Sequence, residues 1–326
     1  MKGIVVTQAH DQPLLVWGDA PDVTMGSEEV LVAVKATAVN RADLLQAQGN
    51  YPPPPGASKI LGLEMAGVIT AVGEEVETWQ PGDRVCALLP GGGYAEKAVV
   101  PANMLLKLPD EWTFAQGAAV PEVWYTAYVN LFLEGDLVKG ETVLLHAGAS
   151  GVGTAAIQLA RSVGATIFVT AGTPEKRQRC RELGAALAIN YKEQDFLEQV
   201  MAATDNQGVD LILDPVGGAY LERNIKALRQ FGRLVIISLL SGRRGEIDMG
   251  PILRNRLKIV GSTLRNRPPS QKVRITRQFK SGFWHQFHSG ELEPVIDSIF
   301  PIQQAQAAHQ YVAQNKNTGK VVLTVQ

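Results

Sequence analysis

The feature that most constrains this chain is a glycine-rich turn between a short apolar run and a helix-forming segment. The turn reads His-Ala-Gly-Ala-Ser-Gly-Val-Gly over residues 146–153. The pyrophosphate of a dinucleotide needs backbone N–H groups at a helix N-terminus and no side chain in its way. The strand-turn-helix context therefore predicts a dinucleotide site at Gly148, Ala149, Ser150, Gly151, Val152 and Gly153. The alternative is a glycine turn that serves only helix packing.

Each residue type in the turn has an expected purpose. Gly148 permits the sharp turn, the small Ser150 occupies the usual position of close approach, and Gly153 lets the helix pack tightly against the strand.

Strand-like and helix-like segments alternate around this turn. We expect helices at 116–133, 151–163, 174–183, 195–203 and 220–228, and strands at 142–146, 166–170, 188–190, 210–214, 233–238 and 258–261. Strands that alternate with helices of about 10 to 15 residues are typical of a parallel sheet with right-handed crossovers. The predicted fold class is α/β, with a doubly wound parallel sheet.

The first third of the chain is richer in short strands, which we expect at 3–6, 30–38, 66–72 and 84–89. Turn signals separate them, which favours a compact β-barrel-like unit. The proline-rich segment 49–56 is predicted to be an exposed loop, because proline lacks a backbone donor. A helix at 270–289 and a strand at 320–325 follow near the end, and this tail is expected to pack on the first unit.

Composition excludes several classes of protein. The 326 residues include 31 Lys and Arg against 32 Asp and Glu, so no net field favours nucleic acid or an anionic membrane. The two cysteines, Cys86 and Cys180, exclude a disulfide framework and fit a reducing compartment. No apolar run approaches the ~20 residues of a membrane span, and the start lacks a signal-peptide pattern. We therefore expect a cytoplasmic protein with neither nucleic acid nor a membrane as partner.

The residues after the second strand indicate which dinucleotide is preferred. An NAD-binding chain usually has Asp or Glu about 20 residues after the glycine turn, to hold the ribose 2′-hydroxyl. Here residues 154–174 contain no acidic residue; the strand ends at Ala171, Gly172 and Thr173, and Lys176 follows. A neutral turn followed by a cation can accept a 2′-phosphate, so these four residues predict NADPH. The neighbouring arginines are interpreted as a solvated helix face.

Several segments together resemble one family. They are residues 40–44 (Asn-Arg-Ala-Asp-Leu), 51–56, 62–64, 146–159 and 315–320. They resemble the zinc-independent NADPH:quinone oxidoreductases of the medium-chain dehydrogenase/reductase superfamily, above all the tumour-suppressor-inducible type. The resemblance implies a GroES-like β-barrel domain at 1–118 and 264–326, a Rossmann domain at 119–263, and NADPH in the cleft between them. It also implies a homodimer paired through strand 257–261.

The resemblance makes one absence meaningful. Zinc-dependent members carry Cys where this chain has Asn40, and His where it has Leu63. An amide and an isobutyl group cannot supply the thiolate and imidazole of a catalytic zinc site. No metal is therefore expected.

The resemblance also implies roles for single residues. Asn40 would donate to negative charge that develops on the substrate carbonyl, the alternative being that it only caps the helix that follows. Tyr51 would stack on a quinone or donate its hydroxyl, unless it only packs its loop. Thr126 would lie near the nicotinamide, unless it only bonds to its own helix.

Further cofactor contacts are implied at strand ends and in the tail. They are Tyr191 at the adenosine phosphate, Val216, Gly217, Ser238, Leu239 and Leu240 along the cofactor, and Arg265, Asn315 and Lys320 near the cleft. For Tyr191, Arg265, Asn315 and Lys320, a place on the surface or in the core is the alternative.

The expected activity is NADPH-dependent reduction of small quinones by hydride or electron transfer. Two alternatives stay open: reduction of activated C=C bonds by an enoyl reductase, and a non-catalytic NADPH-binding or RNA-binding protein of the crystallin kind.

Overall fold

The computed structural model describes residues 1–9 and 12–326, which form two compact units. Unit 1 comprises Met1–Tyr125 and Arg265–Gln326, and unit 2 is Thr126–Leu264. The first boundary falls within helix α3 (Pro121–Tyr128), whereas the sequence predicts it at residue 118. Among the described residues, no helix is both long and apolar enough to cross a membrane.

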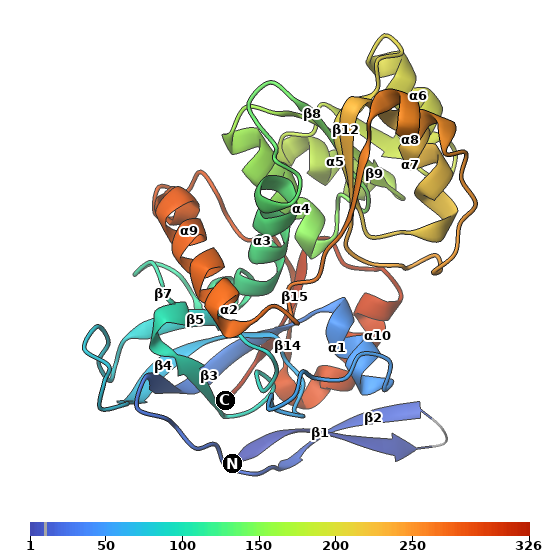
Figure 1. The fold of residues 1–326 in the computed structure, drawn as a ribbon. Helices are drawn as coiled ribbons and strands as arrows, with labels where there is room; N and C mark the ends of the chain where they lie inside the picture. Colours follow the sequence, from blue (N-terminus) through green and yellow to red (C-terminus); the bar gives the residue numbers. More distant parts are fainter. Residues whose placement is uncertain (10–11) are drawn as a thin grey trace. The chain divides into compact units, whose positions relative to one another are not determined.

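Unit 2 is built on a six-stranded parallel sheet (Figure 1). The strand order is β10–β9–β8–β11–β12–β13. The strands are β8 (Thr142–Leu145), β9 (Thr166–Ala171), β10 (Leu187–Asn190), β11 (Val209–Asp214), β12 (Leu228–Ile236) and β13 (Lys258–Gly261). The chain builds outward from β8 on one side and then returns to add β11 on the other. The turns after β8 and β11 therefore lie at a topological switch point, where open α/β sheets bind ligands.

Helices connect these strands. They are α4 (Gly151–Ser162), α5 (Pro174–Leu183), α6 (Phe196–Ala203), α7 (Leu221–Ala227) and α8 (Gly250–Asn255). Local sequence sets their starts: the Ser150 side chain accepts from Gly153 N–H at 3.0 Å, and the Asp195 side chain accepts from Leu197 N–H at 2.8 Å. The predicted parallel α/β sheet is confirmed.

Unit 1 contains a seven-stranded sheet and a separate hairpin, β1 (Lys2–Ala9) with β2 (Gln12–Asp19). The sheet order is β14–β15–β3–β4–β5–β7, and β6 also pairs with β3. Its strands are β3 (Glu29–Val39), β4 (Glu64–Val72), β5 (Arg84–Leu88), β6 (Lys97–Pro101), β7 (Leu105–Lys107), β14 (Ile296–Pro301) and β15 (Lys320–Thr324). Its other helices are α1 (Arg41–Ala47), α2 (Phe114–Ala118), α9 (Pro269–His288) and α10 (Ala305–Ala313). Strand β15 pairs with β3, so the end of the chain joins this unit as expected.

The sequence patterns are wrong at several elements. They predict one helix over 116–133, but the structure has α2, α3 and a π-helical turn at Val129–Leu133. Pro121 begins α3 because proline cannot donate within a continuing helix and suits a first helical position. Helices α8 and α10 and strand β14 are not predicted from the sequence, because these short segments lack a clear apolar period.

Candidate functional site

The glycine-rich turn lies between β8 and α4. A Cβ at Gly148 would lie 2.6 Å from Val169 Cβ, and a Cβ at Gly153 would lie 2.5 Å from the carbonyl oxygens of Ala147 and Gly148. The left-handed residue of the turn is Ala147, with φ of 54°. Both glycines are therefore required by close packing, and the sharp turn that the sequence assigns to Gly148 is made at Ala147.

Three backbone N–H groups of this turn make no hydrogen bond within the described residues. Those of Ala149, Gly151 and Val152 have no hydrogen-bond acceptor anywhere in the described chain. They lie at the N-terminus of a helix of 12 residues. Unpaired N–H groups and the helix dipole there attract anions. The residues present fit the pyrophosphate of a dinucleotide.

The segment after β9 and the residue after β10 lie together. A Cβ at Gly172 would lie 2.8 Å from Tyr191 Oη and 3.1 Å from Lys192 Cε. Tyr191 is 46% exposed, so it lies over Gly172 at the surface. Thr173 caps α5, in whose first turn Lys176 lies. Lys192 is an added cation that the sequence reasoning missed, although it directly follows Tyr191.

The turn after β11 is fixed by a carboxylate. Asp214 accepts from the N–H of Val216 at 2.6 Å and from that of Gly217 at 3.2 Å. Gly217 has φ of 84°, and a Cβ there would lie 2.9 Å from Leu239 Cδ2. Other predicted cofactor contacts also lie at or just after the carboxyl ends of strands: Ala171, Ser238, Leu239 and Leu240.

Thr126 lies on helix α3, where its carbonyl accepts from Asn130 Nδ2 at 2.7 Å.

Unit 1 contains a buried polar cluster of Asn40, Glu64 and Lys320. Lys320 Nζ lies 2.7 Å from both Glu64 Oε1 and Asn40 Oδ1, and Asn40 Nδ2 donates to Glu64 Oε1 at 2.8 Å. The three residues are at most 8% exposed. Pairing of β15 with β3 brings Lys320 to the end of β3, next to Asn40.

This cluster fixes the orientation of the Asn40 amide. Its oxygen faces an ammonium group, which only donates, and its nitrogen faces a carboxylate, which only accepts. The second amide hydrogen points to Ala38 O at 3.4 Å. Asn40 occupies the N-cap position of α1, but there its N–H donates to Asp43 Oδ2 at 2.9 Å. Burial raises the pKa of Asp43 to about 6.

Arg265 holds the loop that carries Tyr51. Its guanidinium donates to Pro90 O at 2.9 Å and to Gln46 Oε1 at 2.6 Å, and it lies 5.3 Å from the centre of the Tyr51 ring. Burial raises the pKa of the Tyr51 hydroxyl. Arg265 is only 4% exposed. Asn315, which the resemblance also places near the cleft, accepts a hydrogen bond from Arg41.

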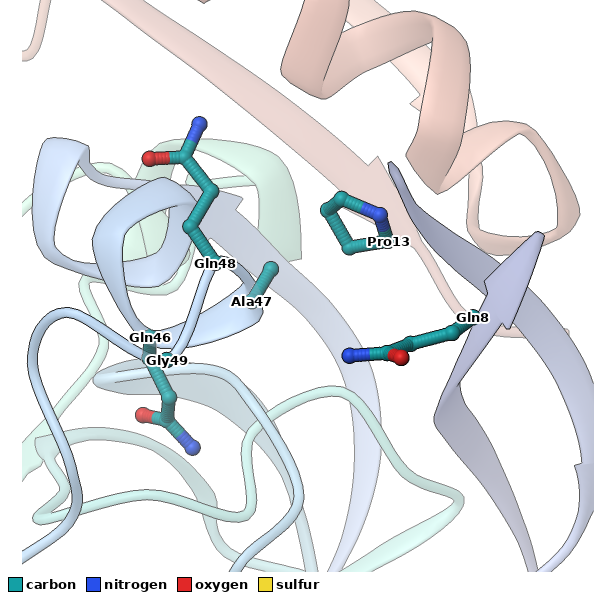
Figure 2. A pocket seen from close by; sticks show the side chains of 6 residues that line it. All are labelled: Gln8, Pro13, Gln46, Ala47, Gln48 and Gly49. Atoms are coloured by element: carbon teal, nitrogen blue, oxygen red, sulfur yellow. The ribbon is translucent and has the colours of Figure 1, made fainter. Parts of the chain in front are cut away.

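A pocket of about 270 Å³ in unit 1 is lined in part by Gln46, the residue that accepts from Arg265. Figure 2 shows Gln8 and Pro13 on the hairpin facing the end of α1, where Ala47 and Gln48 lie. Its lining contains none of the predicted site residues.

In residues 1–9 and 12–326, no group of three or more His, Cys, Asp or Glu side chains is arranged to hold a metal ion. Leu63 is buried in the core.

Sequence models of two families match the chain. One is described as "Alcohol dehydrogenase GroES-like domain" and covers residues 26–110, and the other as "Zinc-binding dehydrogenase" and covers residues 151–278. Quinone oxidoreductase of Homo sapiens is 31% identical over 299 residues, which are 90% of this chain and 88% of that protein.

Solved structures are similar over nearly the whole chain. Escherichia coli quinone oxidoreductase complexed with NADPH matches with a TM-score of 0.89, at 27% identity, over 100% of both chains. CurK enoyl reductase matches with a TM-score of 0.84, at 31% identity, over 96% of this chain and 95% of that one. The chain therefore belongs to the quinone oxidoreductases, within the medium-chain dehydrogenase/reductase superfamily of oxidoreductases.

Proposed function

We propose that the protein reduces small quinones with NADPH, without a metal ion. The observation that carries this proposal is the set of unpaired N–H groups at Ala149, Gly151 and Val152, at the switch point of the sheet. A Cβ at Gly148 or Gly153 would disrupt this cradle. The similarity to quinone oxidoreductases, one of them solved with NADPH, supports the same reaction.

Unit 2 would bind the cofactor, which supplies the hydride when bound. The cradle would hold the pyrophosphate, and Val216, Gly217 and the residues after β12 would line the remaining length, with Thr126 nearest the nicotinamide. Lys176, Tyr191 and Lys192 would contact the 2′-phosphate. Quinones are strong electrophiles, so orientation matters more than a strong acid, and solvent would complete protonation.

Unit 1 would supply the residues for the quinone. The Asn40 amide is held rigidly by Glu64 and Lys320, which preorganises a polar surface there. The Tyr51 ring, held by Arg265, would stack on the quinone. Both hydrogens of the Asn40 amide are already engaged, which favours positioning over direct donation.

Kinetics with two cofactors test the cofactor preference. KM should be at least about tenfold lower for NADPH than for NADH, because an added phosphate contact of about 1.4 kcal/mol has this effect. Lys176→Ala should bring the KM for NADPH closer to the KM for NADH. Arg179→Ala is the matched control, because Arg179 pairs with Glu182 on the exposed face of the same helix. Equal KM values for the two cofactors in the wild-type protein would contradict the preference.

A second candidate function is enoyl reduction, favoured by the similarity to CurK enoyl reductase. Turnover of 1,4-benzoquinone should be compared with that of an α,β-unsaturated ketone or thioester. Turnover of only the second class would replace quinone reduction by enoyl reduction. Salt-dependent binding of RNA at submicromolar protein, without turnover, would support the non-catalytic alternative.

We also propose a homodimer paired through β13. This strand is one of the two edge strands of the six-stranded sheet, and Ile259 on it is 41% exposed. Sedimentation at micromolar concentration should give a dimer, and a monomer would refute the proposal.

A further inference from the structure

A chain of buried polar side chains lies directly behind the glycine-rich turn of unit 2. It runs from Asp214 on β11 through Asn224 on α7 and His146 after β8 to Thr170 on β9. Each of the four is at most 2% exposed. None of them is among the predicted cofactor contacts, so their burial needs another explanation.

Three hydrogen bonds join these four side chains, and a fourth joins them to the turn. Asn224 Nδ2 donates to Asp214 Oδ2 at 3.0 Å, and Asn224 Oδ1 lies 2.7 Å from His146 Nε2. His146 Nδ1 lies 3.1 Å from Thr170 Oγ1. Thr170 Oγ1 then accepts from Ala147 N–H at 3.3 Å. The turn is thereby connected to a carboxylate on another strand.

The direction of each hydrogen bond follows from the two ends. The Asp214 carboxylate accepts, so the Asn224 nitrogen faces it and the Asn224 oxygen faces the ring. His146 Nε2 therefore carries a hydrogen. Burial lowers the pKa of His146 to about 4, so the ring is neutral and Nδ1 accepts from the Thr170 hydroxyl. The hydroxyl oxygen is left to accept from Ala147.

Each end of this hydrogen-bonded series of side chains holds a turn that faces the proposed cofactor. Asp214 holds the turn at Val216 and Gly217 through their N–H groups. At the other end, Thr170 holds Ala147, whose left-handed backbone costs about 1 kcal/mol for a residue other than glycine. The N–H of Gly148 also donates to Thr170 O at 2.9 Å. Thr170 thus holds two consecutive residues of the turn.

We propose that Thr170, His146 and Asn224 are positioning residues for the dinucleotide site. They fix the backbone of Ala147, and this aims the unpaired N–H groups of the following residues at the pyrophosphate. The inference rests on the proposed use of NADPH.

A matched pair of substitutions at Thr170 tests this inference. Thr170→Val keeps the volume and removes the hydroxyl, which leaves His146 Nδ1 and Ala147 N–H unpaired, whereas Thr170→Ser keeps the hydroxyl. In a fluorescence titration of the full chain with NADPH, Kd should rise about tenfold in the valine variant and stay within about twofold in the serine variant.

A buried threonine of unit 1 provides the control. Thr37 is 0% exposed, and its hydroxyl donates to Glu64 O at 2.6 Å. Thr37→Val should lower stability to urea without changing the Kd for NADPH. An unchanged Kd in Thr170→Val, an equal loss in Thr170→Ser, or an equal loss in Thr37→Val would overturn the inference.

A double variant tests whether the residues act as one chain. Asn224→Leu should raise Kd about tenfold, and combining it with Thr170→Val should add little. A rise of about a hundredfold in the Kd for NADPH in the double variant would mean that the two residues act independently, and it would overturn the inference that they act as one hydrogen-bonded series. A wild-type protein that binds neither NADPH nor NADH would overturn the proposed function and this inference with it, whereas tight wild-type binding with normal variants overturns the inference alone.

Discussion

The two units bury polar side chains in different ways. In unit 1, Lys320 and Glu64 form an ion pair 2.7 Å apart that also orients Asn40. In unit 2, a neutral His146 connects an amide and a hydroxyl. Losing one member of a buried ion pair leaves an unpaired charge, whereas losing one member of a hydrogen-bonded chain leaves an unpaired dipole. Unit 1 should therefore be far less tolerant of substitution at its polar cluster.

The largest effect is expected from Lys320→Met. It leaves the Glu64 carboxylate buried without its cation, so the free energy of unfolding should fall by about 3–5 kcal/mol in urea denaturation. Lys97→Met is the control, because Lys97 pairs with Asp22 at the exposed surface and its loss should have little effect. Equal effects of the two substitutions would mean that the buried ion pair is no more sensitive than an exposed one, and the contrast between the two units would then fail.

Acid pH should reveal a feature that the units share. Burial lowers the pKa of His146 in unit 2 and of His309 in unit 1 to about 4, below the ordinary value of 6.5. Between these values each of these two histidines binds more protons in the unfolded chain, so the two of them lower stability as pH drops from about 6.5 to about 4.

Replacing His309 measures its share of this loss. Relative to wild type, His309→Gln should avoid up to about 3 kcal/mol of destabilisation on going from pH 7 to pH 4.5. Burial raises the pKa of Asp43 and Asp214 to about 6, which acts in the opposite direction, so the variant must be compared with wild type at each pH. An unchanged pH dependence would mean that His309 is already protonated or solvated.

A smaller loss is expected from Asn224→Leu in unit 2. It leaves His146 Nε2 without a partner and removes one of the two donors to Asp214 Oδ2, the other being Gly217 N–H, at a cost of about 1–3 kcal/mol. Lys226→Leu on the exposed side of the same helix is the control, with little change expected. A loss as large as that of Lys320→Met would show that the unit 2 chain is as sensitive as the ion pair.

The smallest effect, and one of opposite sign, is expected from Ala147→Gly. Glycine relieves the left-handed backbone at this position but has more freedom to lose on folding, so stability should rise by less than about 1 kcal/mol. Ala149→Gly is the control: Ala149 has no positive φ, so the same substitution there should destabilise. Destabilisation by Ala147→Gly would argue against strain in the turn.

Periodicity predicted the elements of unit 2 better than those of the tail. The helix predicted at 174–183 matches α5 (Pro174–Leu183), because Thr173 and Pro174 mark its start and Gly184 its end. The predicted strand 258–261 matches β13. Helix α10 and strand β14 were missed because small and mixed residues there leave no clear apolar period.

The sequence by itself determined the glycine-rich turn, the order of strands and helices around it, and the neutral end of β9. These features depend on neighbours along the chain, such as a glycine after a strand or a capping residue before a helix, so local chemistry is enough to predict them.

Only the tertiary structure decided which polar side chains meet. Lys320 and Glu64 are far apart in sequence and meet because β15 pairs with β3, which also pairs with β4. Asn224 looks like an ordinary helix residue, yet packing of α7 brings it between Asp214 and His146. Long-range strand pairing and helix packing make these contacts, and no local pattern records them, because the free energy that selects them comes from burial of the whole sheet.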